Sequence, residues 1–157
     1  MKRRAFLARA AAALGALPFE APAQDVPKPR FQPAQDITPL VMAITGGVAP
    51  EKKDVEVDLP LIVENGNSVT LRVRVASPMT VEDHVKAIHV FAERNPRPRV
   101  ASFFLGPQAG KAEVGARIRL AGSQQVTVLA ELSGGRFRVG LRDVLVTTAA
   151  CLDDASL

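Results

Sequence analysis

The sequence predicts an all-β protein, an immunoglobulin-like antiparallel β-sandwich of about seven strands with one short N-terminal helix. Three observations predict it. Apolar and polar residues alternate with a period of two along several segments, most clearly from Val69 to Val75. Turn-forming runs such as Asn65-Gly66-Asn67 and Gly134-Gly135 separate these segments at short intervals. The chain has 157 residues, 47% of them apolar, which is enough to bury the core of one domain.

The expected elements follow in order along the chain. A helix comes first, because Thr38 can cap it, Pro39 suits its first turn and Gly46 can end it. Strands are then expected at about residues 55–59, 69–75, 86–93, 100–105, 112–120, 124–132 and 136–148. In the last of these, the apolar residues change from odd-numbered to even-numbered positions, which predicts a β-bulge near Arg142–Asp143.

The N-terminal residues have the features of an export signal. Residues 1–23 combine a basic start, an apolar stretch too short to span a bilayer comfortably, and an A-x-A site at Ala21-Pro22-Ala23. Arg3-Arg4 is similar to the twin-arginine motif, which directs folded proteins to the bacterial periplasm. The alternative is an ordinary secretory signal that contains two arginines. Either signal places the start of the mature chain near Gln24.

The remainder is expected to hold one folded domain and an arm. Residues 24–35, rich in Pro and Gln, are expected to form a linker, residues 36–148 the β-sandwich domain, and residues 149–157 a C-terminal arm. Most of the net charge of +4 belongs to the signal, because residues 24–157 hold 16 basic and 15 acidic side chains. A near-neutral domain without Trp or Tyr lacks the basic stripe and the stacking platforms of nucleic-acid binding proteins. We therefore expect no nucleic-acid partner.

Familiar catalytic and metal-binding motifs are missing from the sequence. One Cys and two His cannot form a four-ligand structural zinc site or a disulfide scaffold. The patterns G-x-G-x-x-G, H-E-x-x-H and G-x-S-x-G do not occur. The run from Gly106 to Lys111 is one residue short of a phosphate-binding loop and is expected to be a hairpin turn. We predict no cofactor, no metal and no enzymatic activity.

The two histidines are five residues apart, so in a strand they point to opposite faces and cannot share a metal. His84 is expected in a turn after Glu82-Asp83. His89 has the same parity as Phe91 and is expected to have a structural or interface role, since acid–base chemistry would need a pocket. The cluster Arg97-Pro98-Arg99 is interpreted as a solvated loop or as a contact for an acidic partner.

Cys151 is the one residue with distinctive chemistry. It lies just past the last expected strand, six residues before the C-terminal Leu157. A lone cysteine in an exported protein is a free reactive thiol or forms an intermolecular disulfide, such as a disulfide-linked dimer. The four residues beyond Thr147 extend up to about 13 Å, far enough to present the thiol to a cleft of another protein. The alternative is an incidental thiol on a frayed end.

Several blocks in order resemble one family. They are Glu64–Val69, Ser77–Thr80, Val85–Pro96, Arg117–Leu120 and Ala130–Ser133. With the twin-arginine motif, they resemble SoxY, the sulfur-carrier subunit of the periplasmic Sox thiosulfate-oxidation system. The resemblance implies a non-catalytic protein that forms a heterodimer with SoxZ and carries sulfur intermediates on Cys151. It also implies three partner enzymes: a c-type cytochrome that attaches thiosulfate, a thiosulfohydrolase that releases sulfate, and a sulfane dehydrogenase that oxidises the remaining sulfur.

The C-terminal arm departs from the pattern of that family. SoxY arms typically end in Gly-Gly-Cys-Gly-Gly, whereas this chain has Ala149-Ala150-Cys151-Leu152-Asp153. Asp153 and Asp154 also disfavour a nearby thiolate. The alternative function is therefore a divergent SoxY paralogue that binds SoxZ without carrying sulfur. A free-standing thiol enzyme is a third hypothesis, but it would need a base or a cation where this sequence has two acids.

Overall fold

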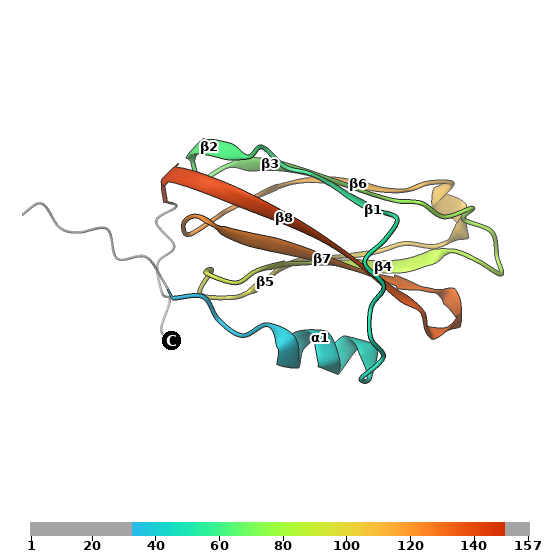
Figure 1. Cartoon of the computed structure of the whole chain (residues 1–157). Coiled ribbons are helices and arrows are strands. Elements are labelled where there is room, and N and C mark those ends of the chain that lie inside the picture. Colours follow the sequence, from blue (N-terminus) through green and yellow to red (C-terminus); the bar gives the residue numbers. More distant parts are fainter. Residues whose placement is uncertain (1–32, 150–157) are drawn as a thin grey trace, which may run out of the picture.

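Two β-sheets face each other in the computed structural model, which describes residues 33–149 (Figure 1). The smaller sheet has the strand order β1-β3-β6 and the larger one β2-β8-β7-β4-β5, which confirms the predicted β-sandwich. The elements of the described part are α1 (Thr38–Thr45), β1 (Val55–Asp58), β2 (Ile62–Asn65), β3 (Val69–Val75), β4 (Val85–Ala92), β5 (Arg99–Phe104), β6 (Ala112–Ile118), β7 (Gln124–Leu132) and β8 (Phe137–Thr148), with short 3₁₀ turns at Pro107–Ala109 and Ser133–Gly135.

The strand that the sequence did not predict is β2. It pairs in parallel with β8, so that Ile62 lies beside Leu145 and Asn65 beside Thr148, whereas the other strand pairs are antiparallel. Only Val63 of its four residues is buried. A strand this short, with one buried side chain, shows no alternation that local pattern could detect.

The core lies between the two sheets and follows the predicted alternation. Along β3 every second side chain is buried and the others face solvent. The buried residues from β3 pack against apolar residues of β4 and β7, and the fully buried larger side chains of this layer include Leu71, Val73, Ile88, Val90, Val126 and Val128. Each such side chain contributes roughly 1.5–3 kcal/mol of burial free energy, so this layer holds the sheets together.

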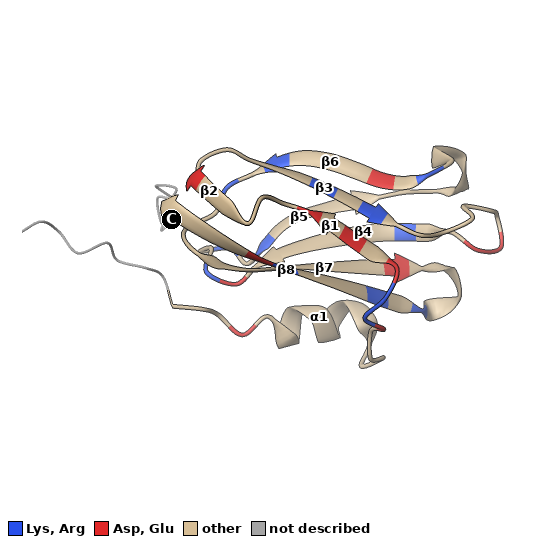
Figure 2. Ribbon diagram, turned by 45° about the horizontal axis from the view of Figure 1, so that its top comes forward, with Lys and Arg blue, Asp and Glu red and all other residues tan. Residues whose placement is uncertain are grey.

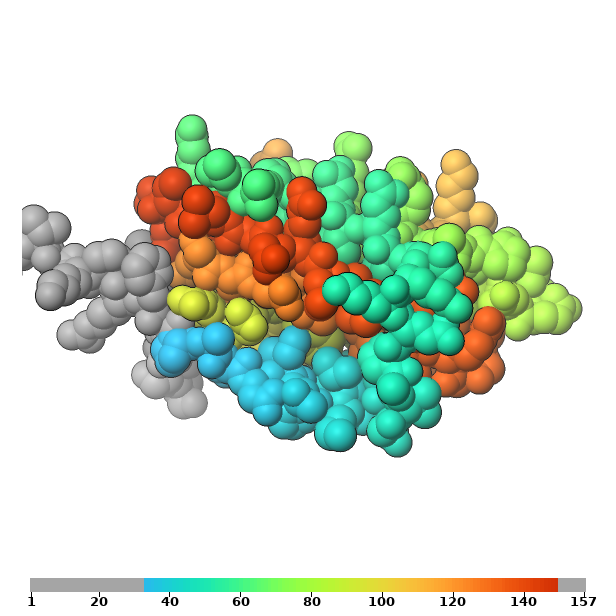
Figure 3. All heavy atoms as spheres, in the orientation of Figure 1, coloured from blue at the N-terminus to red at the C-terminus, as the bar shows by residue number. Residues whose placement is uncertain are grey.

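Helix α1 covers the outer face of the larger sheet, as the space-filling view shows (Figure 3). Its contacts are apolar: Ile37, Leu40, Val41 and Ile44 pack against Phe91, Leu129 and Phe137. No helix among residues 33–149 is long and apolar enough to cross a membrane.

The predicted cap of this helix was wrong by one residue. The N-cap position is Ile37, and Thr38 is already helical. Asp36 supplies the polar contact instead, because its Oδ1 accepts a hydrogen bond from the Thr38 amide at 2.9 Å. Gly46 ends the helix as predicted, with a left-handed φ of 63° that favours glycine.

The predicted bulge in the last strand was also wrong. The register between β7 and β8 runs without a shift from Gln124 beside Val144 to Glu131 beside Phe137. The change of apolar parity has a different cause, because β8 buries both of its faces. Phe137 packs under α1 on the outer face, while Val144 faces the smaller sheet.

The turn between Gly106 and Lys111 is not a hairpin. It contains a 3₁₀ turn and connects β5, which pairs with β4, to β6, which pairs with β3. The chain therefore crosses from one sheet to the other at this point, and the left-handed φ of 68° at Gly110 closes the turn.

Candidate functional site

Cys151, the predicted attachment residue, lies outside the described residues, as do residues 1–23 of the predicted export signal. The structure does describe the end of β8 from which the C-terminal arm begins. There the carbonyl oxygen of Thr148 accepts a hydrogen bond from the Gly66 amide at 2.8 Å. The hydroxyl of Thr147 donates to the carbonyl oxygen of Glu64 at 3.0 Å. Strand β8 is thus held in place until three residues before Cys151.

Gly66 joins this strand end to a second segment. Its carbonyl oxygen accepts a hydrogen bond from the Leu120 amide at 2.9 Å, in the loop between β6 and β7. The turn itself is closed by Asn65, whose Oδ1 accepts a hydrogen bond from the Asn67 amide at 2.9 Å. Such an Asx turn fixes the direction of the backbone that follows β2.

A buried asparagine connects the loop between β4 and β5 to the loop between β6 and β7. Asn95 is only 6% exposed. Its Nδ2 donates to the carbonyl oxygen of Arg119 at 2.8 Å, and its Oδ1 accepts from the Ala121 amide at 2.9 Å and from Gln124 Nε2 at 3.2 Å. Gln124 in turn accepts a hydrogen bond from the Arg94 amide at 2.8 Å.

Ser123 returns the network to β8. Its hydroxyl accepts a hydrogen bond from the Val146 amide at 2.9 Å and donates to the Val146 carbonyl oxygen at 3.3 Å. We call this region the arm root; it comprises residues 147–148, 66–68, 93–98 and 119–123. Side chains and backbone groups from four separate segments therefore fix the point at which the arm starts.

Five arginines lie on or beside the arm root: Arg94, Arg97, Arg99, Arg117 and Arg119. Figure 2 shows the blue basic segments at the end of β6 and at the loop between β4 and β5. None of the five forms an ion pair within residues 33–149. The Nε atom of Arg94 is buried without a hydrogen-bond partner among the same residues.

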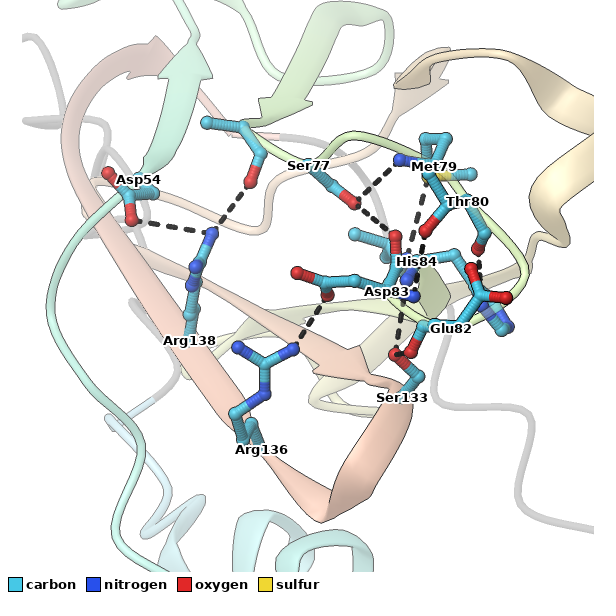
Figure 4. A network of polar contacts seen from close by, with 12 residues as sticks. Asp54, Ser77, Met79, Thr80, Glu82, Asp83, His84, Ser133, Arg136 and Arg138 are labelled. Carbon is cyan, nitrogen blue, oxygen red and sulfur yellow. Dashed lines mark hydrogen bonds and ion pairs between the residues drawn. The ribbon is translucent and has the colours of Figure 1, made fainter.

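The opposite end of the sandwich carries a denser polar network (Figure 4). Arg136 pairs with Asp83 at 2.6 Å, and Arg138 pairs with Asp54 at 3.3 Å. Met79 adopts a φ of 52°, is 5% exposed, and accepts a hydrogen bond from the Val85 amide through its sulfur. The Arg136–Asp83 pair and the Met79 hydrogen bond hold the connection between β3 and β4, where the chain crosses between sheets, and the Arg138–Asp54 pair joins β8 to the start of β1. Their role is structural.

The histidines lie apart from the arm root. His84 precedes β4, as predicted, with its Nδ1 atom 3.1 Å from the carbonyl oxygen of Thr80. His89 is buried in β4, and its Nδ1 lies 2.9 Å from the Ser102 hydroxyl oxygen. Burial lowers the pKa of His89 below its usual range, the charge of Arg99 lowers it further, and Glu131 opposes the shift.

Two other kinds of site, a metal centre and a surface groove, can be compared with the arm root. No group of three or more His, Cys, Asp or Glu side chains in the described part of the chain is arranged to hold a metal ion. An open groove at the end away from the arm root is lined by Asp54, Arg74, Lys111 and Glu113 among others, and Arg74 is already paired with Glu56 and Glu113. Neither feature competes with the arm root as a functional site.

A family model described as sulfur oxidation protein SoxY matches residues 41–151. The chain belongs to the SoxY family. A solved structure, the sulfur carrier protein SoxY from Chlorobium limicola f thiosulfatophilum, is 29% identical, with a TM-score of 0.59 over 69% of this chain and 94% of that one. No curated protein sequence matches this chain.

Other solved structures share only the fold. A superoxide reductase (neelaredoxin) from Ignicoccus hospitalis is 15% identical with a TM-score of 0.54, covering 65% of this chain and 89% of that one. A putative superoxide reductase from Thermotoga maritima is 21% identical with a TM-score of 0.52, covering 61% and 87%. At these identities the likeness identifies a common β-sandwich and no common chemistry.

The SoxY blocks of the sequence acquire a spatial meaning in the structure. Glu64–Val69, the end of Val85–Pro96, and Arg117–Leu120 come together at the arm root, although the sequence separates them by tens of residues. Sequence reasoning named these blocks but did not identify Gly66 and Asn95 as positioning residues. Their presence inside the blocks was the available signal.

Proposed function

We propose that this SoxY-family chain is a periplasmic sulfur carrier that holds thiosulfate-derived sulfur covalently on Cys151. The observation that carries the proposal is the position of the cysteine. The family match runs to residue 151, which is the single cysteine of the chain, and β8 is held by hydrogen bonds up to Thr148. The similar solved structure is that of a sulfur carrier protein. A fixed strand end followed by a short arm suits a residue that enters the clefts of other proteins.

The proposed chemistry begins with the thiolate of Cys151, a soft nucleophile that forms and breaks S–S bonds by exchange. Oxidative loading joins the thiolate to thiosulfate: RS⁻ and S₂O₃²⁻ give RS–S–SO₃⁻ and two electrons, which pass to a c-type cytochrome enzyme. Hydrolysis of this adduct gives RS–SH and HSO₄⁻ and is assigned to a thiosulfohydrolase. A sulfane dehydrogenase then oxidises the sulfur that remains. The carrier itself catalyses none of these steps and needs no cofactor of its own.

The proposal includes a SoxZ-type subunit as a stable partner. Edge strands expose unpaired backbone groups, and a partner that covers such an edge removes the risk of aggregation. Strand β2 is an edge strand of the larger sheet. Leu61, Ile62 and Leu145, which lie at this edge, are each more than half exposed. This apolar surface supports pairing with a second β-sandwich, and the twin-arginine motif at Arg3-Arg4 supports export to the periplasm.

The test is an intact mass of the mature protein from cells that oxidise thiosulfate, measured with and without reductant. We expect a reductant-sensitive adduct on Cys151, in mass steps of sulfur or of a thiosulfate-derived group, and we expect Cys151→Ser to lose it while still pairing with the SoxZ-type subunit. A doubled mass that reductant removes would instead identify a disulfide-linked dimer. An unmodified thiol throughout would favour the alternative, a SoxY paralogue that binds without carrying sulfur.

A further inference from the structure

We propose that the five arginines at the arm root form a docking surface for an acidic rim around the cleft of a partner enzyme. We call these residues, Arg94, Arg97, Arg99, Arg117 and Arg119, the arginine rim. The inference rests on the proposed function, because it assumes that Cys151 enters such a cleft.

The reach of the arm forces a contact. Thr148 is held by the Gly66 amide, and Cys151 follows three residues later. Three residues span at most about 11 Å, even when fully extended. An active site at the bottom of a cleft can receive Cys151 only if the edge of that cleft comes against the surface around Thr148. The arm root is therefore part of the interface with any enzyme that acts on the cysteine.

Within residues 33–149, no acidic side chain forms an ion pair with the arginines of this surface. The described acids on neighbouring segments include Asp36, Glu64, Glu93 and Asp143, and three of these four accept other hydrogen bonds. Asp36 accepts from a backbone amide of α1 at 2.9 Å, Glu93 from the Gln125 amide at 3.5 Å, and Asp143 from Gln125 Nε2 at 3.0 Å. Within residues 33–149 the cations that do form ion pairs all lie elsewhere: Lys53, Arg74, Lys86, Arg136 and Arg138.

The spread of the arginine rim favours a protein surface over a small anion. Arg117 lies at the end of β6 in the smaller sheet and Arg119 in the loop that follows it, whereas Arg99 begins β5 in the larger sheet. Facing sheets are separated by roughly 10 Å, so the backbone segments that carry these arginines are spread over both layers of the sandwich. Guanidinium groups bind carboxylates through paired hydrogen bonds, which identifies Asp and Glu side chains as the matching chemistry.

The hydrogen bonds of the arm root keep this surface in register with the arm. Asn95 fastens the loop of Arg94 and Arg97 to the carbonyl oxygen of Arg119. Ser123 fastens the following residues to Val146 of β8. Because docking surface and arm start share one rigid support, binding of the arginine rim would aim the cysteine into the cleft.

The test uses the mature chain in complex with its SoxZ-type subunit and the thiosulfohydrolase from the same organism. Cys151 is first loaded with tetrathionate, in which RS⁻ and S₄O₆²⁻ give RS–S–SO₃⁻ and S₂O₃²⁻, and the adduct is followed by intact mass. Sulfate release by the enzyme is then measured at 50 and 500 mM salt. The variant combines Arg97→Glu with Arg119→Glu, and both of these side chains are exposed. The control combines Lys52→Glu with Lys111→Glu, whose side chains are also exposed but lie outside the arm root.

Rim charges act mainly on association rate and are screened by salt, so we expect the arginine variant to lower kcat/KM for sulfate release by about 10-fold or more at 50 mM salt. At 500 mM salt, kcat/KM of the arginine variant should come within about 3-fold of that of the unmodified chain. The kcat/KM of the lysine control should stay within about 2-fold of it at both salt concentrations. Equal sulfate release by all three proteins would overturn the docking inference. So would a variant whose tetrathionate loading slows at 50 mM salt as much as its sulfate release, because the rim would then serve small anions.

Failure of the proposed function has a different signature. If tetrathionate adds no mass to Cys151 in the unmodified chain at either salt concentration, then the cysteine is not a sulfur acceptor and the inference loses its premise. If loading succeeds and only the charge effect is missing, the carrier function stands and the docking surface lies elsewhere.

Discussion

Asn95 provides the most direct test of how the arm root is held together. Replacement by alanine removes three hydrogen bonds: one donated to the Arg119 carbonyl oxygen at 2.8 Å and two accepted from the Ala121 amide at 2.9 Å and Gln124 Nε2 at 3.2 Å. Ala121 and Gln124 are only 7% and 6% exposed, so water cannot easily replace the lost partner. A hydrogen bond contributes about 0.5–1.5 kcal/mol, and a buried polar group left unpaired costs about 1–3 kcal/mol. We therefore expect Asn95→Ala to lower the free energy of unfolding by about 2–5 kcal/mol.

The free energy of unfolding is measured by urea titration of the unmodified chain and of Asn95→Ala. The chain has no Trp or Tyr, so the transition is followed by far-ultraviolet circular dichroism in place of intrinsic fluorescence. Asn67→Ala is the matched control, because Asn67 is exposed and a surface truncation changes stability by less than about 0.5 kcal/mol. An unchanged m-value would show that the midpoint shift reports stability.

Hydrogen exchange tests the local part of the same prediction. The amides of Ala121 and Leu120 should exchange faster in Asn95→Ala, since the first loses its acceptor and the second lies next to Arg119 in the loosened loop. A loss below about 1 kcal/mol, or unchanged exchange at both amides, would refute the claim that Asn95 holds the two loops together.

Two further predictions follow from the packing of β8 and from His89. A Cβ at Gly140 would lie 2.8 Å from Val55 Cγ1 and 3.0 Å from the Val55 carbonyl oxygen, so Gly140→Ala should destabilise the fold by about 1–3 kcal/mol. Gly115→Ala in β6 meets nothing within 4 Å and should leave the urea midpoint unchanged; equal effects of the two variants would contradict the close approach of β1 to β8. Burial lowers the pKa of His89, so below the usual value of 6.5 the unfolded chain binds a proton that the folded chain resists. The free energy of unfolding should therefore fall as the pH drops below about 6.5. In urea titrations from pH 7.5 to 5, His89→Gln should show a smaller dependence of this free energy on pH. An identical pH dependence in both proteins would exclude His89 as the cause.

The sequence predicted the strands and the helix because their signals are local. A half-buried strand such as β3 repeats its buried positions every two residues, and a helix end such as Gly46 depends on the conformation of one residue. The same locality explains the wrong bulge in β8. When the apolar residues of one strand change from odd-numbered to even-numbered positions, the local pattern indicates a bulge. In β8 the cause is different, because α1 covers one face of the strand at Phe137 and the smaller sheet covers the other at Val144.

The arm root was less accessible to sequence reasoning because its contacts join distant segments. The hydrogen bond from Gly66 to Thr148 requires the parallel pairing of β2 with β8, and nothing in a four-residue segment with one buried side chain indicates a parallel neighbour. Asn95 resembles an ordinary turn residue until the loop after β6 is placed beside it. Only the family blocks indicated that these segments matter, and they did so without showing that the segments meet.

The two ends of the sandwich differ in how their charges are satisfied, and this difference has a functional consequence. At the end away from the arm, Arg136 and Arg138 are paired with Asp83 and Asp54, so a partner would have to break an existing contact to bind them. At the arm root the arginines have no ion pair among residues 33–149, so an acidic partner would gain an interaction there without breaking an ion pair of that part of the chain. In the proposed function, any protein whose cleft admits Cys151 could act on it. The proposed arginine rim would restrict that set to proteins with an acidic edge, because a basic edge would be repelled before Cys151 could enter.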